Sequence, residues 1–201
     1  MNEARLYKNV FLGKNVEIGD YVIIGKPPKG KADGELKTVI GDNAIIRSHT
    51  VIYAGNQIGD RFQTGHHVLI REENEFGNDV SIGSGSVVEH HVRLNDGVRL
   101  HSQVFICEYS RCNAHAWIGP NVVFTNAKYP EYEGVMDHLI GATVGEKAKV
   151  GANTTLLPEI EIGPDALIGA GSVVTKSVPG NEVWVGNPAK KLKDADSVRY
   201  V

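Results

Sequence analysis

Aliphatic residues recur at every sixth position along most of the chain. From Ile40 this six-residue frame runs to Phe124 with Thr64 as its polar exception, and a second run extends from Val144 to Val174. A shorter run begins at Leu12. A second series, two residues ahead of each frame position, holds mostly small or β-branched residues. Its members include Val80, Ser86, Val92, Val98, Val104 and Val122.

A period of six fits neither the 3.6-residue repeat of a helix nor the two-residue repeat of an isolated strand. It fits a short strand followed by a turn, with two inward residues on each side. Three such sides close a triangular coil of 18 residues, and stacked coils pair through parallel strands. The pattern therefore predicts an all-β parallel β-helix of about eight coils. An all-β fold with irregular short strands is the alternative, but it does not require one continuous frame.

The residue after each inward aliphatic lies at a corner, and every third corner belongs to one column. The first column reads Gly41, Gly59, Gly77, Asn95, Asn113, Gly145, Gly163. The second reads Arg47, Gly65, Gly83, His101, Gly119, Gly151, Gly169. The third reads Tyr53, Arg71, Glu89, Cys107, Thr125, Leu157, Thr175. Because tight turns often need positive φ, we expect the glycine-rich corners to have it.

Both interruptions of the frame follow the third corner, so we expect loops 26–38 and 125–143 to leave the β-helix from one edge. Loops on a rigid scaffold often carry function. We expect the β-helix to span residues 1–185 and residues 186–201 to form a partly helical cap, which would cover the open parallel edge of the last coil.

Four polar residues follow the third corner at intervals of 18: Glu72, His90, Glu108 and Asn126. Stacked coils should place them above one another, roughly 5 Å apart. A carboxylate on each side favours the protonated form of the imidazole and can orient the ring. This column is our candidate catalytic group (His90, Glu108, Asn126). The alternative is an exposed polar ladder that only solvates a corner.

Residues beside this column are candidates for substrate binding: Arg71, Glu72 and Tyr109. His66 and His101 belong to the second corner and are weaker candidates. In a trimer, the second corner of one subunit can face the third corner of the next. We therefore expect His66 or His101 to complete a shared site.

Bulk properties exclude several classes. The 201 residues carry a formal net charge of -3, which gives no reason to expect a nucleic-acid partner. No apolar run approaches the roughly 20 residues of a membrane span, and the start lacks the layout of a signal peptide. Two cysteines, Cys107 and Cys112, are too few for a disulfide scaffold, so a cytoplasmic location is expected.

The stretches TGHHVLIREENEFGNDVSIGSGSVVEHH, LHSQVFICEY and WIGPNVVFTNAKYP resemble nucleotide-sugar N-acyltransferases of the hexapeptide-repeat superfamily. The similarity is greatest to enzymes that acetylate dTDP-linked 3-amino-3,6-dideoxyhexoses. The ending IGAGSVVTKSVPGNEVWVGNPAKKLK is similar to the last coil and cap of hexapeptide acyltransferases generally. The resemblance runs from about Ile40 to Lys193.

The resemblance implies a left-handed β-helix and a homotrimer with active sites between subunits. It implies transfer from acetyl-CoA, as co-substrate and without metal, to the amino group of a nucleotide-linked sugar in a ternary complex. Such enzymes serve O-antigen or S-layer glycan biosynthesis. The cysteines would not be nucleophiles. Pantetheine would pass Gly151, Ala152, Gly169 and Ala170, and the phosphates would lie near Lys190, Lys191 and Lys193.

One position departs from the family pattern: residues 125–127 read TNA where many relatives carry TND. Ala127 therefore lacks a carboxylate that would help to hold an ammonium or hydroxyl group. A sugar O-acetyltransferase is the first alternative. A γ-carbonic-anhydrase-like metalloenzyme and a non-catalytic assembly protein are the others, although the paired histidines lack the spacing expected of a three-histidine zinc site.

Overall fold

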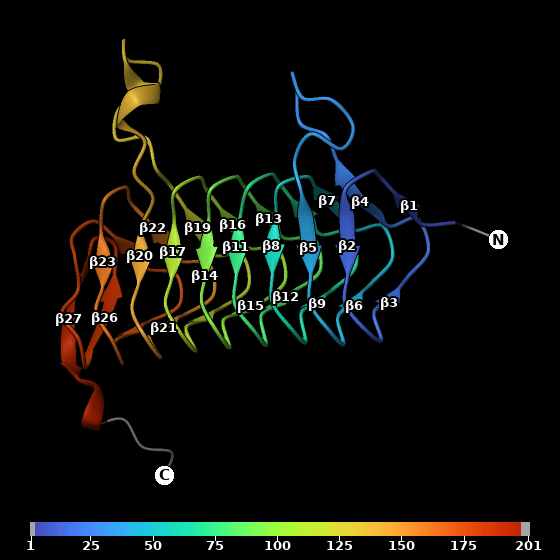
Figure 1. Cartoon of the computed structure of the whole chain (residues 1–201). Coiled ribbons are helices and arrows are strands. Elements are labelled where there is room, and N and C mark those ends of the chain that lie inside the picture. The colour runs from blue at the N-terminus through green and yellow to red at the C-terminus, as the bar shows by residue number, and fades with distance from the viewer. Residues whose placement is uncertain (1–2, 198–201) are drawn as a thin grey trace.

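The computed structural model describes residues 3–197 and forms a parallel β-helix with three flat sides (Figure 1). From β1 to β25, consecutive strands along the chain belong to different sheets, and each strand up to β22 pairs with the strand three elements later. The prediction of a left-handed β-helix built from hexapeptide repeats is confirmed.

Each of the three sides is one parallel sheet. Sheet A contains β1 (Arg5–Leu6), β4 (Ile23–Lys26), β7 (Val51–Tyr53), β10 (Leu69–Ile70), β13 (Val87–Val88), β16 (Phe105–Ile106), β19 (Val123–Phe124), β22 (Thr155–Leu156) and β25 (Val173–Val174). Sheet B contains β2 (Val10–Leu12), β5 (Thr38–Ile40), β8 (Gln57–Ile58), β11 (Glu75–Phe76), β14 (Arg93–Leu94), β17 (Arg111–Cys112), β20 (Thr143–Val144) and β23 (Glu161–Ile162). Sheet C contains β3 (Glu17–Ile18), β6 (Ile45–Ile46), β9 (Gln63–Thr64), β12 (Ser81–Ile82), β15 (Arg99–Leu100), β18 (Trp117–Ile118), β21 (Lys149–Val150), β24 (Leu167–Ile168), β26 (Glu182–Gly186) and β27 (Ala189–Asp194).

The six-residue frame is the core of the β-helix. In each two-residue strand the second side chain points inward, as in β10 and β13, where Ile70 and Val88 are fully buried. The register keeps these residues in ladders, with Ile70 paired to Ile52 on one side and to Val88 on the other. Parallel pairing buries each coil's apolar face against its neighbours, so cohesion depends on stacking.

The corner glycines have a different physical cause from the one the sequence suggests. Gly41 and Gly59 in the first column and Gly65 in the second do not have positive φ, and neither do the other corner glycines of these two columns, so that prediction is wrong. A Cβ on Gly59 would lie 2.7 Å from the carbonyl carbon and oxygen of Gly77 in the next coil. The column is therefore small because successive coils approach closely at the corner.

Positive φ falls instead two residues beyond the corner glycine, and mostly on residues other than glycine. Asn43, Arg61 and Asp79 hold this place after sheet B, with φ of 58°, 56° and 58°. His67, Glu73, His91 and Tyr109 hold it after the other two sheets. The left-handed conformation costs these residues energy, which the stacked coils must offset.

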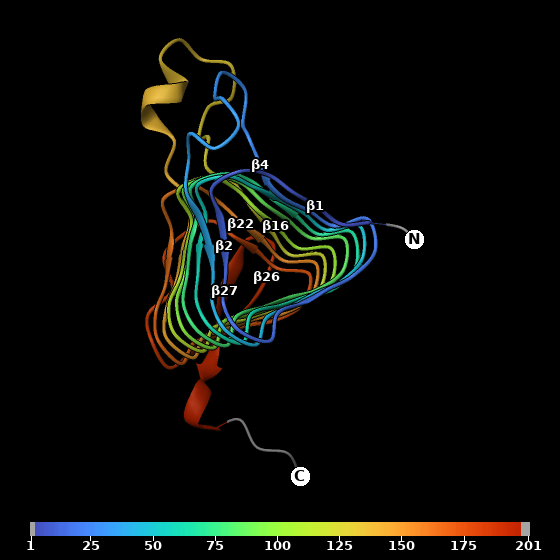
Figure 2. The ribbon, with the colours of Figure 1, turned by 45° about the vertical axis from the view of Figure 1, so that its right-hand side comes forward.

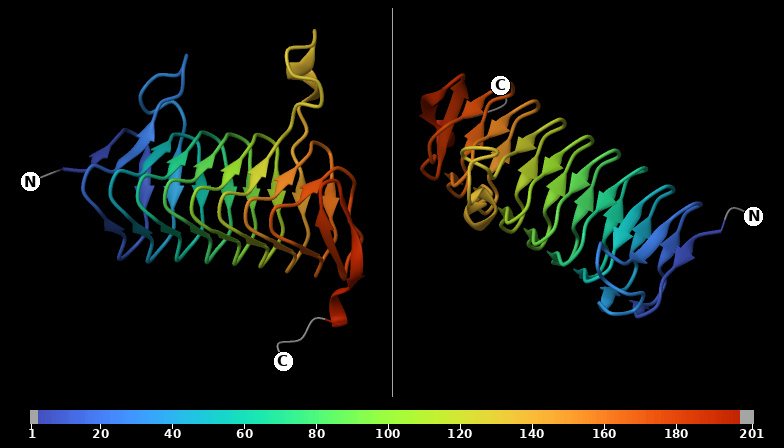
Figure 3. Two further views of the ribbon diagram at one scale, coloured as in Figure 1. Left: turned by 180° about the vertical axis from the view of Figure 1, so that it is seen from behind. Right: turned by 90° about the horizontal axis from the view of Figure 1, so that it is seen from above.

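Both long loops leave the β-helix at the corner between sheets A and B. One follows β4, and the other lies between β19 and β20 and contains a short 3-10 helix, η1 (Val135–His138). Figures 2 and 3 show the two loops rising from the same edge of the triangular prism. The expectation of two loops from one edge is confirmed.

The C-terminal segment continues sheet C and then folds back on it. β26 pairs in parallel with β24, and β27 returns antiparallel to β26. The only helical turn in this segment, among residues up to 197, is η2 (Ala195–Ser197), so the expected cap is built mainly from strands. Residues 198–201 of the predicted cap lie outside the described residues. Within the described chain, no helix is long and apolar enough to span a membrane.

Candidate functional site

We call the corner after sheet A the third edge, and the corner after sheet C the second edge. On the third edge, the 18-residue spacing brings His90, Glu108 and Asn126 together. Asn126 Nδ2 donates a hydrogen bond to Glu108 Oε2 at 2.8 Å, and His90 Nε2 lies 3.7 Å from Glu108 Oε1. We refer to these three residues as the third-edge cluster. It lies at the base of the loop that begins after β19.

Within the third-edge cluster, the contact between His90 and Glu108 is long enough to leave room for a further polar group. A nitrogen–oxygen distance of 3.7 Å is longer than a hydrogen bond, so His90 Nε2 and Glu108 Oε1 can both accept a further polar partner from the side. The His90 and Glu108 side chains are about one quarter exposed, at 25% and 24%. A small amine or hydroxyl can therefore reach both atoms.

The rings beside His90 fix its orientation. His90 Nδ1 lies 2.8 Å from His91 Nδ1, so one ring donates an N–H there and the other accepts it. The Tyr109 ring centroid lies 5.8 Å from that of His90 and 5.5 Å from that of His91. His91 Nε2 in turn lies 3.8 Å from Glu73 Oε2. Because Nδ1 is occupied, Nε2 is the ring nitrogen of His90 that is left for a further partner.

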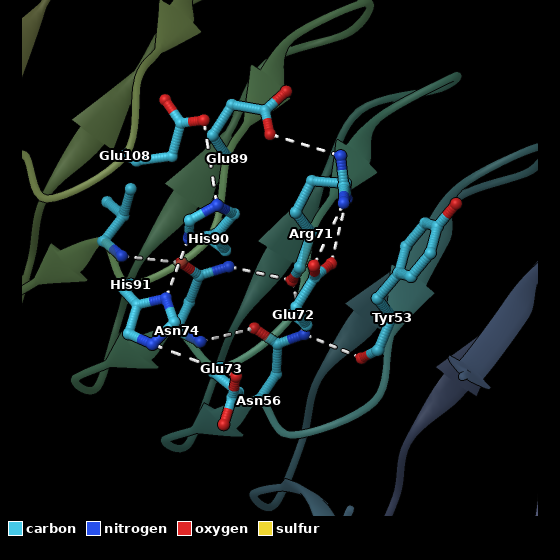
Figure 4. A network of polar contacts seen from close by, with 11 residues as sticks. Tyr53, Asn56, Arg71, Glu72, Glu73, Asn74, Glu89, His90, His91 and Glu108 are labelled. Atoms are coloured by element: carbon cyan, nitrogen blue, oxygen red, sulfur yellow. Dashed lines mark hydrogen bonds and ion pairs between the residues drawn. The ribbon is translucent and has the colours of Figure 1, made fainter. Parts of the chain in front are cut away.

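Glu72 has a different partner from the rest of its column. Both of its oxygens accept hydrogen bonds from Arg71, at 2.9 and 3.0 Å, in a bidentate pair (Figure 4). The same guanidinium reaches Glu89 at 3.4 Å and lies 5.1 Å above the Tyr53 ring. Arg71 therefore pairs with two carboxylates, Glu72 in its own coil and Glu89 in the coil of His90.

The electrostatic environment differs between these two carboxylates. Burial alone would raise the pKa of Glu72, but hydrogen bonds from Arg71 and from its own backbone outweigh this and hold the pKa below its usual value. Burial raises the pKa of Glu89, and the negative charge of Glu108 adds to the rise against the opposing effect of Arg71. On the third edge, therefore, the charged form of Glu72 is stabilised and the charged form of Glu89 is destabilised.

Two buried asparagines support this edge from inside, as Figure 4 shows. Asn56 Nδ2 donates to the carbonyls of Tyr53 and Arg71 at 2.7 and 2.8 Å. Asn74 Nδ2 donates to the Arg71 carbonyl at 2.9 Å, and its Oδ1 accepts from the Val92 N–H at 2.7 Å. The two amides are fully buried and fix the corner backbone that presents the Arg71 side chain.

On the second edge, His66 and His101 line one depression of about 350 Å³. His66 Nδ1 lies 2.8 Å from Ser48 Oγ, and its backbone N–H donates to Ser84 Oγ. The ring of His101 packs against that of Trp117, with 4.6 Å between the two ring centroids. His101 Nε2 is buried with no hydrogen-bond partner among the described residues. Burial, together with the nearby charge of Arg99, lowers the pKa of His101.

The two thiols are inert in this structure. Cys107 and Cys112 are 2% and 1% exposed, and burial raises their pKa values to about 11 and about 12. A thiol is nucleophilic only as thiolate. This agrees with the expectation that neither cysteine forms a covalent intermediate.

The residues expected to contact acetyl-CoA lie at the other end of the second edge. Gly151 and Ala152 follow β21, and Gly169 and Ala170 follow β24. Lys191 in the cap pairs with Glu182 and Asp194 at 2.8 and 2.7 Å, which raises its pKa and occupies its charge. Lys190 and Lys193 are exposed on the same hairpin. Within residues 3–197, no group of three histidine, cysteine or acidic side chains could hold a metal ion.

The outer face of sheet A is mostly apolar from β4 onward. The outward positions there are Ile23, Val51, Leu69, Val87, Phe105, Val123, Thr155 and Val173, and β1 adds Arg5 at the N-terminal end. From β8 onward the matching positions on sheet B are charged or polar: Gln57, Glu75, Arg93, Arg111, Thr143 and Glu161. The first two strands of that sheet have Phe11 and Val39 there. Sheet A lies between the second and the third edge, so its apolar face has a candidate site on each border.

Several residues near the site were not singled out from the sequence. They are Glu73, His91, Asn56 and Asn74. Asn56 and Asn74 occupy the second inward series, where small or β-branched residues are usual, so a polar residue in that series is the signal that would have identified them.

Comparison with known proteins gives a family match over part of the chain. Residues 141–176 match the family model described as the bacterial transferase hexapeptide, six repeats. Together with the parallel coils of the whole β-helix, this match shows a fold built from hexapeptide repeats. The bifunctional protein GlmU of Staphylococcus haemolyticus is 29% identical to it over 92% of the chain and 41% of GlmU. The chain therefore spans about two fifths of that relative's length.

Two solved structures share the fold of this hexapeptide-repeat protein. LpxA, a UDP-N-acetylglucosamine acyltransferase from Bacteroides fragilis, superposes with a TM-score of 0.56 at 15% identity and covers 96% of this chain and 73% of LpxA. PerB from Caulobacter crescentus, solved with CoA and GDP-perosamine, superposes with a TM-score of 0.51 at 23% identity and covers 59% of this chain and 51% of PerB. At these levels of identity, both structural similarities support the fold alone.

Proposed function

We propose that this hexapeptide-repeat protein is an acetyl-CoA-dependent N-acetyltransferase that modifies the amino group of a nucleotide-linked amino-deoxy sugar, with dTDP as the nucleotide. The observation that carries the proposal is the third-edge cluster, in which Asn126 orients Glu108 and His90 faces the same carboxylate. The transferase family match and the CoA and GDP-perosamine bound by PerB support the class of reaction.

The cluster suits an amine acceptor. The sugar nitrogen would bind between His90 Nε2 and Glu108 Oε1, where it replaces the long contact with two short hydrogen bonds. Its lone pair attacks the thioester carbon, the new C–N bond forms and the C–S bond breaks. One proton passes from nitrogen to the released sulfur, with His90 or Glu108 able to hold it during transfer.

A homotrimer is the assembly we propose. Three copies that pack the apolar faces of sheet A around a common axis would bury Phe105 and Val123, each 37% exposed in the single chain. The same packing brings the second edge of one subunit against the third edge of the next. Phe105→Glu should convert trimers to monomers in light scattering, whereas Arg93→Glu on sheet B should not.

Activity assays test the proposal directly. Thiol release from acetyl-CoA should occur with dTDP-amino sugars and fail with the matching hydroxy sugars. The reverse preference would indicate the sugar O-acetyltransferase that Ala127 leaves as the second candidate.

Single substitutions test the cluster. Glu108→Ala, His90→Ala and Asn126→Ala should each lower kcat/KM. Loss of a hydrogen bond to a charged group is worth about 1.5–3 kcal/mol, or about 10- to 100-fold. Asn113→Ala, on the corner after sheet B, is the control. If all three cluster variants keep wild-type kcat/KM, the site lies elsewhere.

A further inference from the structure

The depression on the second edge has an unusual charge composition for this protein. Its lining includes Arg47, Arg99, His66 and His101 and contains no aspartate or glutamate. The whole chain, in contrast, has 24 acidic and 21 basic residues. We call this depression the second-edge pocket. An acid-free pocket with two guanidinium groups, in a protein of net negative charge, is complementary to an anion.

Neither guanidinium is neutralised. Among residues 3–197, no carboxylate forms an ion pair with Arg47 or Arg99, although Arg61, Arg71 and Arg93 all have one. Arg47 Nη1 donates to the Thr64 carbonyl at 2.6 Å, which directs the guanidinium toward the next coil and the middle of the pocket. The other guanidinium N–H groups of Arg47 remain available.

The pocket also provides neutral polar groups. Ser81, Ser84 and Ser102 line it with hydroxyls. His101 Nε2 is buried without a partner among the described residues, and an unpaired buried polar atom destabilises the folded state. A ligand group that bonded this nitrogen would remove that cost. The pocket follows four coils, from the Arg47 coil to the Arg99 coil, which is about 14 Å along the axis.

We propose that the second-edge pocket binds the nucleoside diphosphate part of the acceptor, with Arg47 and Arg99 on the diphosphate. This inference rests on the function proposed above and adds the position of the nucleotide. The pocket extends from the level of the third-edge cluster toward the N-terminus, because β15 and β16 belong to the same coil region. The residues assigned to acetyl-CoA follow β21 and β24, on the C-terminal side.

This arrangement separates the two substrates along the axis. The acceptor nucleotide lies in the early coils of one subunit's second edge. Its sugar reaches His90 and Glu108 on the third edge of the neighbour, and the acyl donor approaches from the later coils. A diphosphate also occurs in CoA, so the test must distinguish the two sources of the same group.

Calorimetric titration of the purified full-length protein is the experiment. The probes are dTDP, UDP, GDP and CoA, each measured with wild type, Arg47→Gln, Arg99→Gln and Arg111→Gln. Arg111 is the matched control because it has the same place in a two-residue strand as Arg99 but lies on sheet B. We expect a nucleoside diphosphate to bind, and each pocket variant to weaken it about tenfold or more. The Arg111→Gln control should bind the nucleoside diphosphate as wild type does, and the affinity for CoA should be the same in all variants.

Three results would overturn the inference: no nucleoside diphosphate binds, binding ignores both pocket variants, or the variants weaken CoA instead. Acetylation assays test the proposed function independently of the pocket. If a nucleoside diphosphate binds through Arg47 and Arg99 but no amino sugar is acetylated, the function fails and the pocket stands. If acetylation proceeds with an unchanged KM in both variants, the pocket fails and the function stands.

Discussion

Asn74 connects the stability of the β-helix to the geometry of the third edge. Its amide is fully buried, donates to the Arg71 carbonyl and accepts from the Val92 N–H. In Asn74→Ala the Arg71 carbonyl keeps a donor from Asn56 at 2.8 Å, but the Val92 N–H is left buried and unpaired. We therefore expect Asn74→Ala to weaken the fold and to loosen the corner that presents Arg71.

The size of the effect follows from these bonds. An orphaned buried donor costs about 1–3 kcal/mol, and the lost bond to Arg71 adds about 1 kcal/mol. A total near 3 kcal/mol corresponds to a fall in Tm of about 6–12 °C for a chain of this size. Asn74→Asp restores the acceptor for Val92 but not the donor, and it buries a charge, so it should rescue little.

Thermal unfolding at equal protein concentration, followed by circular dichroism, is the measurement. Asn95→Ala is the control, because this asparagine lies on the corner after sheet B and its amide reaches Asn113 only at 3.5 Å. The reasoning is refuted if Asn74→Ala changes the Tm no more than Asn95→Ala does.

Three further predictions follow from packing and charge. Gly59→Ala should destabilise the fold, because its Cβ would lie 2.7 Å from Gly77 backbone atoms; an unchanged Tm would show that the coils can separate. Glu89→Gln should raise the Tm near pH 7, since the raised pKa of Glu89 means that its charged form is disfavoured in the folded state. The gain should vanish below its unfolded value of 4.5, and a gain that persists there would contradict the assignment. Cys107 and Cys112 should resist alkylation at pH 8 until the protein unfolds, and rapid labelling of native protein would contradict their burial.

The sequence predicts the coil because one physical requirement, an inward apolar residue at each strand, repeats along most of the chain, with Thr64 as an exception and two loops as interruptions. It also predicts which residues stack, since an 18-residue spacing maps directly onto neighbouring coils. Spacing does not determine side-chain direction. Glu72 belongs to the same column as His90, yet it pairs with Arg71, whose bidentate geometry outcompetes a longer contact.

The corner glycines show a second limit. From the sequence, a turn that needs positive φ and a turn that needs a missing Cβ both favour glycine. Only the distance between Gly59 and the next coil separates the two causes. The cap hairpin was equally hidden, because GNPAKK carries no six-residue frame and its strand pairing depends on contact with β24.

Because the coils are uniformly spaced, distances along the axis of the β-helix change in steps of about 4.8 Å. Inserting one whole 18-residue coil between Phe124 and Gly151 would move the cap away from His90 by one such step and leave every other pairing intact. An insertion that is not a multiple of 18 residues cannot extend the ladders, and the chain would accommodate it as a loop, as it does after β4 and β19. The reach from donor site to acceptor site can therefore change only in whole steps, while the loops are free to vary in length.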